Sequence, residues 1–480
     1  MNNLQQEKTD LNLQDYIKEG QRGLARLCRK LYHDDFIFNH TNGVWHIYEN
    51  GRWKPDLLQQ VRKYVSGGLY GILEPELVKV QEMYEDADKD GKNALKPILE
   101  ETSQAVRGLN YKTYIQAVLE LASSELPAHE SMFDTNPYLF ICGNGVYDLK
   151  NQAFDKHRPQ FLISKIPSCD YDDKAQCPNW ERFIEMIFME DKQLIDYVQR
   201  AVGYSISGLK DFQGFFFCFG HGANGKSTFF NVLKLLLQDY YQTIPIDSLL
   251  AKNAQGTDYH IATLKGSRLV VSSEIPEGKS LNESLIKDLT GGDTITARHI
   301  YGKPFQFEPT HKLWMFGNHK PIIKGDDHGI WRRVHLIPFE YKFESEARRD
   351  MDEVIEEFKA ELPGILNWCI EGFNKFMESG LTAPEVVNNH VREYKKELNS
   401  IASWYEERAE RWETDTEFSE LYGDYQAYCE DTGAFQLSKK RMSAYLKDAG
   451  FDVVAGAGNK RVVLRCGIKG GAIISKNLPF

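Results

Sequence analysis

A stretch in the middle of the chain has the residue types that hold the phosphates of a nucleotide. Residues 220–227, GHGANGKS, fit the pattern G-x-x-x-x-G-K-[ST] without a mismatch. Glycines in such a loop let backbone N–H groups turn toward phosphate oxygens, and a helix beginning there adds the partial positive charge of its N-terminus. We expect Lys226 to reach the β- and γ-phosphates of ATP and the Ser227 hydroxyl to bind Mg²⁺. The predicted nucleotide-binding residues are Gly220, His221, Gly222, Ala223, Asn224, Gly225, Lys226, Ser227 and Thr228.

Such a loop needs a strand before it and a helix after it. The apolar residues 215–219 predict a short strand buried on both faces. From Lys226 onward, apolar side chains recur at helical spacing, at Phe229, Val232, Leu233, Leu236 and Leu237. This setting favours a phosphate-binding loop over the alternative, a chance glycine turn.

Two further buried strands are expected to end in polar side chains that act on the nucleotide. Residues 268–274, RLVVSSE, place Glu274 where a carboxylate can orient and activate the attacking water. We assign the metal to Ser227 and Glu274. The alternative is that Ser227, the phosphates and waters carry the metal alone, because this chain has Ser273 where many ATPases have a metal-binding Asp. Residues 313–316 predict a third strand, and the amide of Asn318 after it could sense the γ-phosphate or position water; an ordinary turn residue is the alternative.

A polar hairpin and an arginine pair complete the central region. Alternating apolar residues over 294–307 predict a hairpin around Gly302, with Arg298, His299, Tyr301 and Lys303 at its tip. Cations beside an aromatic ring suit a nucleic-acid backbone, and a solvated hairpin tip is the alternative. Arg332 and Arg333 precede another strand, and an arginine delivered to a neighbouring subunit's γ-phosphate stabilises charge in the transition state.

The C-terminal region has the pattern of a winged helix-turn-helix domain. A helix over 418–430 is followed by a basic helix that Ser438 should N-cap and Gly450 should close. A hairpin with a glycine-rich basic tip follows. This order is typical of DNA-binding winged helices, and a small packing domain with a charged face is the alternative. The predicted DNA-binding residues here are Lys439, Lys440, Arg441, Lys460 and Arg461.

Length and composition indicate a multidomain globular chain of 480 residues, with 42% hydrophobic and 26% charged residues. No apolar run approaches the roughly 18 residues of a membrane span, and the polar start and the scattered cysteines predict a cytoplasmic protein, in a bacterial host cell or a virus-infected cell. The net charge of −11 argues against a passive DNA coat. It is compatible with a ring that holds DNA in a basic channel.

The regions outside the central core divide the chain further. We expect a mostly helical domain at 1–130, containing a three-stranded meander over 36–53. We expect Trp45, Tyr48 and Trp53 to form the core of this meander, because aromatic residues on a small meander are usually core residues; stacking on nucleobases is the alternative. Residues 86–91 imitate a calcium loop but lack its Glu at position 12, so a solvated loop between helices is expected. A pre-core region at 131–204 should end in a helical stretch over about 180–203. The remaining predicted segments are an ATPase core at 205–345, helices at 346–412, the winged helix at 413–468 and a tail at 469–480.

The motifs taken together resemble superfamily 3 helicases. GHGANGKST, RLVVSSE, LTGGDTITARHIYGKPFQF, WMFGN and GIWRRV occur in the order found in that superfamily, in particular in the helicase half of phage, plasmid and poxvirus-type primase-helicases. The upstream segments NGVYDL, CPNW and RAVGYSISG and the downstream ELPGILNWCIEGF also resemble these proteins. The resemblance implies a multidomain α/β fold with an AAA+-type P-loop ATPase core, assembled as a hexameric ring that moves along single-stranded DNA, usually 3′ to 5′.

By the same resemblance, Glu274 is the catalytic carboxylate, Asn318 is sensor 1, and Arg332 or Arg333 is the finger acting in the neighbouring subunit. The hairpin over 298–303 would enter the pore. The N-terminal region lacks an evident acidic triad for nucleotide polymerisation, so a separately encoded primase or polymerase is the expected partner. Single-stranded and forked DNA are the expected substrates, in replication of a phage, plasmid or mobile element. The alternatives are an origin-binding or remodelling ATPase without processive unwinding, and a P-loop kinase of small molecules.

Overall fold

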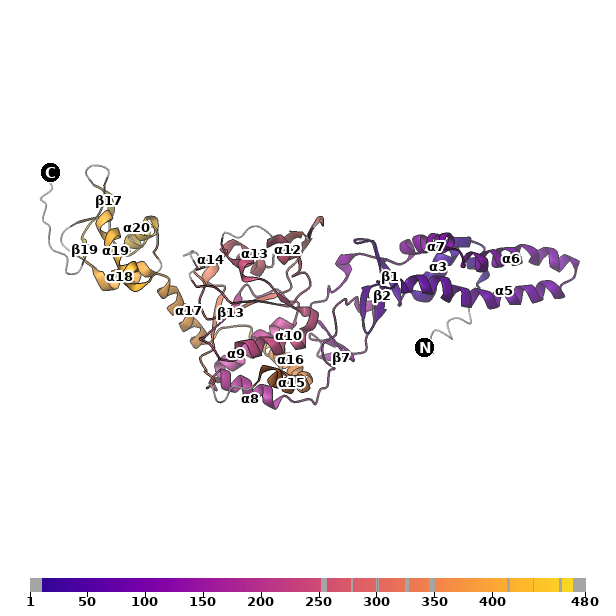
Figure 1. Ribbon diagram of the computed structural model, residues 1–480, viewed down its shortest axis with the longest axis horizontal. Coiled ribbons are helices and arrows are strands. Elements are labelled where there is room, and N and C mark those ends of the chain that lie inside the picture. Colours follow the sequence, from indigo (N-terminus) through magenta and orange to yellow (C-terminus); the bar gives the residue numbers. More distant parts are fainter. Residues whose placement is uncertain are drawn as a thin grey trace.

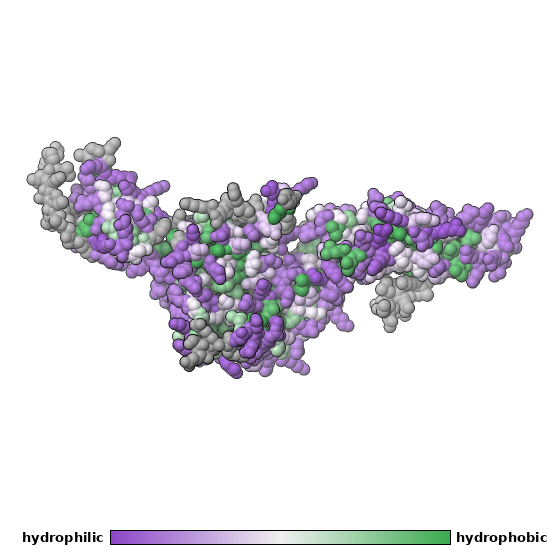
Figure 2. Space-filling view, in the orientation of Figure 1, coloured by the Kyte–Doolittle hydropathy of each residue, from purple (hydrophilic) through white to green (hydrophobic). Residues whose placement is uncertain are grey.

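The computed structural model is elongated, with a helical N-terminal body, a central body and a small C-terminal body along its longest axis (Figure 1). The structure describes residues 11–251, 257–277, 279–298, 300, 302–323, 328–344, 350–411, 415–434, 436–456 and 460–468. Figure 2 shows that the visible face is mostly hydrophilic, with hydrophobic residues in small separate patches. In the described part of the chain, no helix has both the length and the apolar character required to cross a membrane.

The N-terminal body combines a small sheet with a bundle of helices. The predicted meander is confirmed, because β1 (Phe36–Asn39), β2 (Val44–Glu49) and β3 (Arg52–Pro55) pair antiparallel. A fourth strand, β4 (Pro127–Ala128), adds to β1 in parallel. The helices are α2 (Gln14–Ile17), α3 (Gly20–Tyr32), α4 (Gln60–Lys63), the π-helix η1 (Tyr64–Gly68), α5 (Leu69–Asp86), α6 (Lys89–Gly108) and α7 (Lys112–Glu125).

Helices α5 and α6 form a long hairpin that projects from this body (Figure 1). The predicted solvated loop over 86–91 is too long, because only Ala87 and Asp88 lie between the two helices. Asp88 is the N-cap of α6, and its carboxylate accepts a hydrogen bond from the backbone N–H of Gly91 at 2.8 Å. This cap starts the helix inside the segment that imitates a calcium loop.

An antiparallel sheet and two helices connect the N-terminal body to the central body. The sheet contains β5 (Leu139–Cys142), β6 (Gly145–Asp148) and β7 (Ala153–Asp155). The predicted helical stretch over about 180–203 is confirmed, but it is divided into two helices, α8 (Pro178–Ile187) and α9 (Lys192–Ile206). Met189 and Glu190 have left-handed φ angles of 53° and 59°, and Asp191 then caps α9 by accepting from the N–H groups of Gln193 and Leu194. A reversal of this kind cannot be read from apolar periodicity.

The central body is built on a parallel sheet of five strands, in the order β14-β8-β13-β10-β9. These strands are β8 (Phe215–Phe219), β9 (Tyr241–Thr243), β10 (Leu269–Ser273), β13 (Lys312–Gly317) and β14 (Val334–Pro338). Alternate residues of β8 enter two different cores: Phe216 packs toward α8, α9 and α10 (Lys226–Leu237), and Phe217 packs toward α13 (Glu283–Gly291). Helices therefore cover both faces of the sheet, which explains why its strands are apolar throughout. The chain is a multidomain α/β protein with a parallel sheet and flanking helices.

The other elements of the central body are shorter or lie at its edges. They are α11 (Ile246–Leu249), α12 (Thr257–Ala262), the hairpin strands β11 (Ile295–Arg298) and β12 (Pro304–Phe307), α14 (His328–Trp331), α15 (Met351–Ala360) and α16 (Leu362–Ser379), together with the short 3₁₀ turns η2 (Glu130–Met132), η3 (Pro159–Phe161) and η4 (Gln238–Tyr240).

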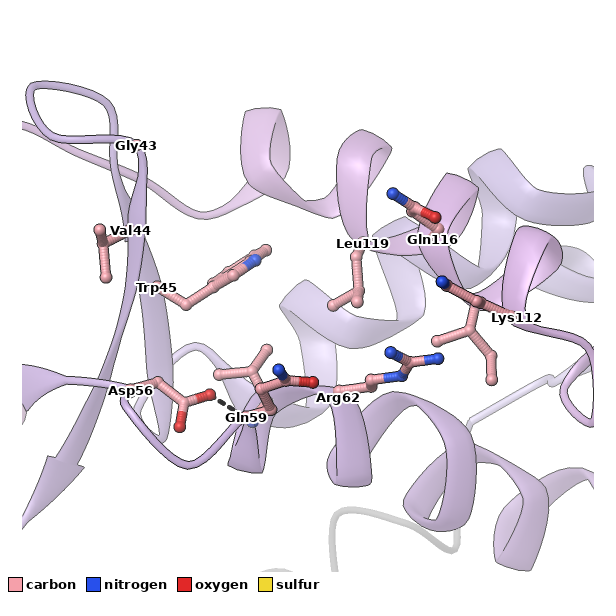
Figure 3. Close-up of a pocket in the computed structure, with 11 residues that line it drawn as sticks. Gly43, Val44, Trp45, Asp56, Gln59, Arg62, Lys112, Gln116 and Leu119 are labelled. Carbon is pink, nitrogen blue, oxygen red and sulfur yellow. Dashed lines mark hydrogen bonds between the residues drawn. The ribbon is translucent and has the colours of Figure 1, made fainter.

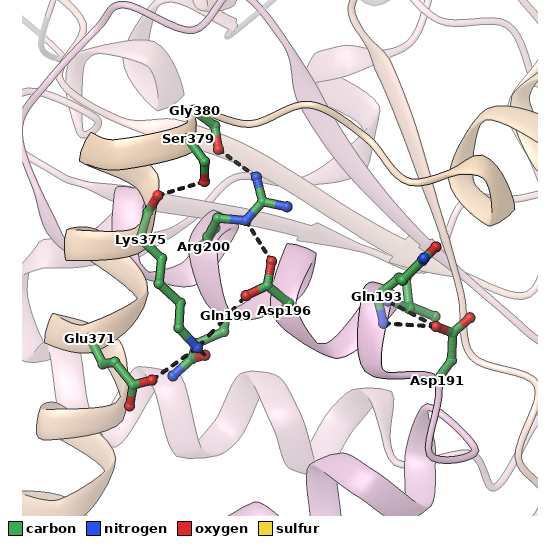
Figure 4. A network of polar contacts seen from close by, with 10 residues as sticks. Asp191, Gln193, Asp196, Gln199, Arg200, Glu371, Lys375, Ser379 and Gly380 are labelled. Carbon is green, nitrogen blue, oxygen red and sulfur yellow. Dashed lines mark hydrogen bonds and ion pairs between the residues drawn. The ribbon is translucent and has the colours of Figure 1, made fainter.

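Helices α9 and α16 are bound tightly to each other. A Cβ on Gly203 would lie 2.1 Å from the backbone N of Phe373, so only glycine permits this crossing. Beside the crossing, Figure 4 shows a polar network in which the Lys375 ammonium lies 2.9 Å from the Glu371 carboxylate and 3.7 Å from that of Asp196. Asp196 also accepts from Arg200 Nε at 2.9 Å. The network fixes α9 against α16 on one face of the sheet.

Two buried cations bind backbone carbonyls at the C-terminal end of α9. Arg268 donates to the carbonyls of Ile206 and Leu139, both at 2.6 Å, and Lys312 donates to that of Ser207 at 2.6 Å. Cations are favoured at this end of a helix by its dipole. His311, the residue before Lys312, is buried, and burial lowers its pKa to about 3. The start of β10 and the start of β13 are thereby attached to the end of α9.

The C-terminal body follows α17 (Glu385–Glu397) and α18 (Ser400–Arg408). The predicted helices over 418–430 and after Ser438 are confirmed as α19 (Phe418–Thr432) and α20 (Lys439–Asp448), and Ser438 caps α20 as expected. Prediction of helix as far as Trp412 is wrong, since β15 (Ala409–Arg411) pairs with β19 (Cys466–Ile468). A second sheet contains β16 (Thr416–Glu417), β17 (Val453–Ala455) and β18 (Arg461–Val463). The tip between β17 and β18, at 457–459, lies outside the described residues.

Candidate nucleotide-binding site

The loop between β8 and α10 has an unusual backbone. Gly222, Ala223 and Gly225 have φ angles of 45°, 48° and 85°, all in the left-handed region. At Gly225, glycine is also required by packing, because a Cβ there would lie 2.7 Å from a methyl carbon of Ile187 and 3.1 Å from the ring of Phe183. The loop therefore curves tightly against α8 before α10 begins at Lys226.

Lys226 lies at the centre of this loop, with only 5% of its surface exposed. Its Nζ donates to the carbonyl of Gly220 at 2.5 Å and to Oδ1 of Asn224 at 3.0 Å. No carboxylate lies within ion-pair distance of this ammonium among the residues that the structure describes. Burial lowers the pKa of Lys226, because its positive charge is partly desolvated and is met only by neutral oxygens. An anion beside Nζ would compensate this charge.

A pocket of about 580 Å³ opens beside the loop, a size that suits a small organic ligand. One side is polar and is formed by Lys226, Ser227 and Thr228. The other side is mostly apolar and comes from α8, α15 and the segment before α15: Phe183, Met186, Phe343, Met351, Val354 and Phe358, with Asn179, Arg182 and Glu357 among them. A flat aromatic base would bury its faces on the apolar side while its phosphates reach the loop. The sequence analysis missed this wall, because its residues read only as the apolar faces of helices.

A single carboxylate links the two helices of the apolar wall. Glu361 follows the end of α15, and its carboxylate accepts hydrogen bonds from the backbone N–H groups of Asn179 and Trp180, at 3.1 and 3.0 Å. These N–H groups belong to the first turn of α8, where a negative charge is favoured. The C-terminal end of α15 is thus joined to the N-terminal end of α8.

The ends of β10 and β13 bring two predicted site residues to the same edge of the sheet as the loop. Glu274 follows β10 with a left-handed φ of 60°, and its side chain is exposed. Asn318 follows β13, and its Oδ1 is 3.5 Å from both the Lys226 Nζ and the backbone N of Gly222. Because β8, β13 and β10 are adjacent and parallel, their carboxyl ends meet here. A non-glycine residue in the left-handed region, as at Glu274, is uncommon and often marks a functional position.

The structure separates Arg332 and Arg333 from this edge. Val334 pairs with Phe215 and Pro338 with Phe219, so both arginines lie at the amino ends of the strands and the loop at the carboxyl ends. The two ends of β14, Val334 and Pro338, are four residues apart, a distance of about 13 Å along the strand. Arg333 is buried and donates to the carbonyl of Gly329 at 2.7 Å, whereas Arg332 is exposed and donates to Oε1 of Gln213 at 3.1 Å. Neither arginine is placed to act at the loop of its own chain.

The predicted DNA-binding residues fall in two separate places. Arg298 and Lys303 are exposed at the base of the hairpin loop, and Ile300 within the loop is 60% exposed. His299 and Tyr301 lie outside the described residues. In the C-terminal body, Lys439 and Lys440 are exposed on the first turn of α20, Arg441 is half-buried, Arg461 is exposed on β18, and Lys460 Nζ is 2.8 Å from the Glu417 carboxylate.

Two parts of the chain match models of known protein families. Residues 25–189 match the family model described as D5 N terminal like, and residues 218–333 match a family of unknown function, DUF5906. The second match contains the loop, Glu274, Asn318 and both arginines.

Curated relatives come from large DNA viruses. The chain is 28% identical over 426 residues to "Putative helicase L207/L206" of Acanthamoeba polyphaga mimivirus, covering 82% of this chain and 44% of that protein. It is 23% identical over 443 residues to "Putative helicase 121R" of Invertebrate iridescent virus 3, covering 80% and 47%. "Putative primase C962R" of an African swine fever virus isolate is 26% identical over 222 residues, covering 44% and 23%. The chain spans less than half the length of these relatives.

A solved structure of the NrS-1 C terminal region, residues 305–718, is also similar, with a TM-score of 0.45 and 10% identity over 93% of this chain and 100% of that one.

Proposed function

We propose that this chain is an ATP-dependent DNA helicase of superfamily 3. The observation that carries the proposal is the environment of Lys226, a buried ammonium that meets only neutral oxygens in a tight glycine loop. A polyphosphate would supply the missing negative charge, and the backbone N–H groups of the loop would bind its oxygens. The apolar wall beside the loop would hold the adenine base.

The residues around the loop are suited to ATP hydrolysis. Ser227, exposed at the start of α10, would bind Mg²⁺, with Glu274 as the nearby carboxylate. Mg²⁺, when bound with ATP, would neutralise charge on the β- and γ-phosphates. Glu274 would orient and deprotonate the attacking water, and Asn318 would position that water or bind the γ-phosphate. The hydrogen-bond distance between Asn318 and Lys226 supports a shared task for the two side chains.

The position of the arginines supports an assembly with sites between subunits. An arginine at the opposite end of the strands can reach only the loop of another copy, so an AAA+-type homohexameric ring is the assembly we propose, with Arg332 as the finger. The hairpin with Arg298 and Lys303 would contact single-stranded DNA in the pore. The C-terminal body, with α20 and the β17–β18 hairpin, would be a winged helix that binds forked or duplex DNA.

The relatives support a role in DNA replication, since they are named as putative helicases and primases of large DNA viruses. We place the chain in replication of a virus, plasmid or mobile element, with movement from 3′ to 5′ and a separately encoded primase or polymerase as partner.

The test is ATP hydrolysis by the full chain with and without single-stranded DNA, read beside the particle mass in solution. We expect DNA to stimulate hydrolysis in a six-subunit particle, and Lys226→Ala to lower hydrolysis by at least about 10²-fold while leaving the mass unchanged. A monomer whose hydrolysis ignores DNA would contradict the proposal. Strand displacement on a fork of arbitrary sequence separates a helicase from a remodelling ATPase, which would hydrolyse ATP without displacing the strand.

A further inference from the structure

A second pocket lies in the N-terminal body, on the same domain as the sheet β1–β3 and far along the chain from the glycine loop (Figure 3). It has a volume of about 340 Å³ and is formed by β2, by the turn before α4, and by α4 and α7. Its lining includes an aromatic ring, two side-chain amides and two cations: Trp45, Gln59, Gln116, Arg62 and Lys112. The carboxylate of Asp56 and four aliphatic side chains, Val44, Val61, Ile115 and Leu119, also form part of the wall.

The aromatic member, Trp45, packs against two neighbouring rings. The indole of Trp45 makes edge contacts with Phe36 and Phe38, with ring centroids 5.5 and 5.1 Å apart. The side chain is only half-buried and extends from β2 into the pocket toward Leu119 of α7 (Figure 3). A preformed aromatic surface beside a hollow is the usual platform for stacking a nucleobase.

The two cations lie across the pocket from the indole (Figure 3). Neither Arg62 nor Lys112 takes part in an ion pair among the residues that the structure describes. The one carboxylate in the wall, Asp56, accepts hydrogen bonds from the backbone N–H groups of Gln60 and Val61 at 2.8 and 2.9 Å. Its charge is therefore directed to the start of α4, and both cations are left to bind an anion in the pocket.

An adjoining hollow extends this pocket along the surface. It measures about 440 Å³, shares Gln59 and Arg62 with the first pocket, and adds the exposed Lys63 and the apolar Leu57 and Leu58. Leu57 and Leu58 are 84% and 75% exposed, which is unusual for leucine. A free nucleotide would need only one hollow. Two hollows that share an arginine fit successive nucleotides of one strand.

We propose that this surface binds single-stranded DNA, with one base stacked on Trp45 and its flanking phosphates on Arg62 and Lys112. Gln59 and Gln116 would bind the base edge, and Leu57 and Leu58 would contact the next nucleotide. The site is separate from the glycine loop and requires no ATP. It would hold the strand in the N-terminal body, which lies on the other side of the central body from the C-terminal body, so that the chain contacts DNA at more than one place (Figure 1).

The first experiment measures binding of a fluorescein-labelled oligo(dT) by anisotropy, on the full chain without ATP and over a series of salt concentrations. The double variant Arg62→Gln, Lys112→Gln should bind at least about 10-fold more weakly, and its salt slope should fall by about 1.4, or about 0.7 for each phosphate that is no longer neutralised. The matched control is Lys89→Gln, Lys96→Gln, which removes the same charge from exposed positions of α6, and it should bind like the parent chain. Equal weakening in the two double variants would overturn the proposal, because it would indicate a general charge effect.

The second experiment locates the contact. An oligonucleotide containing 4-thiothymidine should photo-cross-link to a peptide containing Trp45, and the cross-link should survive excess thymidine monophosphate. Trp45→Phe should keep the affinity that Trp45→Ala loses. Displacement by the monophosphate would assign the pocket to a free nucleotide and refute strand binding, and cross-links confined to other bodies would also refute it. Lys226→Ala should cross-link like the parent chain, so this result is independent of whether the chain hydrolyses ATP.

Discussion

Arg332 and Arg333 are neighbours in sequence, yet their replacement by alanine should damage the protein in different ways. Arg333 is 8% exposed, and its guanidinium donates to the carbonyl of Gly329 at 2.7 Å. Losing a buried hydrogen bond from a charged group costs about 1.5–3 kcal/mol. At about 2–4 °C per kcal/mol for a domain of this size, Arg333→Ala should lower the unfolding temperature of the central body by about 3–12 °C.

Arg332→Ala should leave that temperature nearly unchanged, because exposed substitutions usually alter the free energy of unfolding by less than about 0.5 kcal/mol. Its effect should appear in catalysis instead. An arginine that stabilises the charge of phosphoryl transfer contributes about 10³–10⁵ to the rate, so hydrolysis by Arg332→Ala should fall by at least about 10³-fold. Calorimetry and steady-state hydrolysis, measured on the same preparations, separate the two effects.

Mixing two inactive variants then tests whether Arg332 acts in the neighbouring subunit. Lys226→Ala lacks a working loop but supplies the arginine, and Arg332→Ala has the reverse defect. In randomly mixed rings at equal ratio, about one quarter of the interfaces combine an intact loop with an intact arginine, so hydrolysis should return to roughly a quarter of the parent rate. A mixture that exchanges subunits but stays as inactive as its parts would refute the assignment. Equal, mild effects of the two single variants would refute it as well.

Two further predictions concern the apolar wall of the nucleotide pocket and a buried imidazole. Met351→Ala should raise the KM for ATP by about 3- to 10-fold and leave kcat unchanged, because it removes an apolar side chain from the wall of the pocket. The control is Met377→Ala on α16: Met377 is similarly exposed but does not line this pocket, so both constants should stay unchanged. The pKa of His311 is lowered to about 3, so its stabilising effect is complete above the unfolded-state pKa of about 6.5 and is lost as the pH falls toward the folded-state value. Relative to the parent chain, His311→Leu should therefore gain about 2 kcal/mol of unfolding free energy between pH 8 and pH 5, measured by denaturant unfolding at each pH; an unchanged difference would show that the imidazole is not the acid-sensitive group.

The local elements were largely predictable from the sequence, because their signals are local. Apolar runs over 215–219 and 268–273 gave the parallel strands, Asn-Gly turns gave the meander, and Ser438 marked the start of α20. The failures come from backbone reversals and from packing. The residue types around Met189 and Glu190 do not predict two left-handed residues. The apolar periodicity continues across this segment without a break, so it does not mark the end of α8.

The candidate site was predictable on its polar side only. The glycine loop follows a short pattern, and strand ends give the positions of Glu274 and Asn318. The apolar wall is formed by α8 and α15, which are far apart in sequence. The residues next to Phe183 and Met351 in the sequence do not indicate that these side chains line a pocket. The different burial of Arg332 and Arg333 likewise could not be predicted, because the two residues are adjacent and of the same type, and both donate to Gln213, which lies far from them in sequence.

The Glu361 carboxylate has a consequence for the wall of the pocket. It joins the end of α15 to the beginning of α8, so these two ends of the wall are held together. The opposite ends of the two helices carry Met186 and Met351, and Met351 Sδ lies 3.5 Å from the Thr228 hydroxyl on α10. The wall is therefore braced twice, by Glu361 between its two helices and by Met351 against the helix that follows the glycine loop. A nucleotide bound as proposed above would contact a wall that is connected to its own phosphate-binding helix.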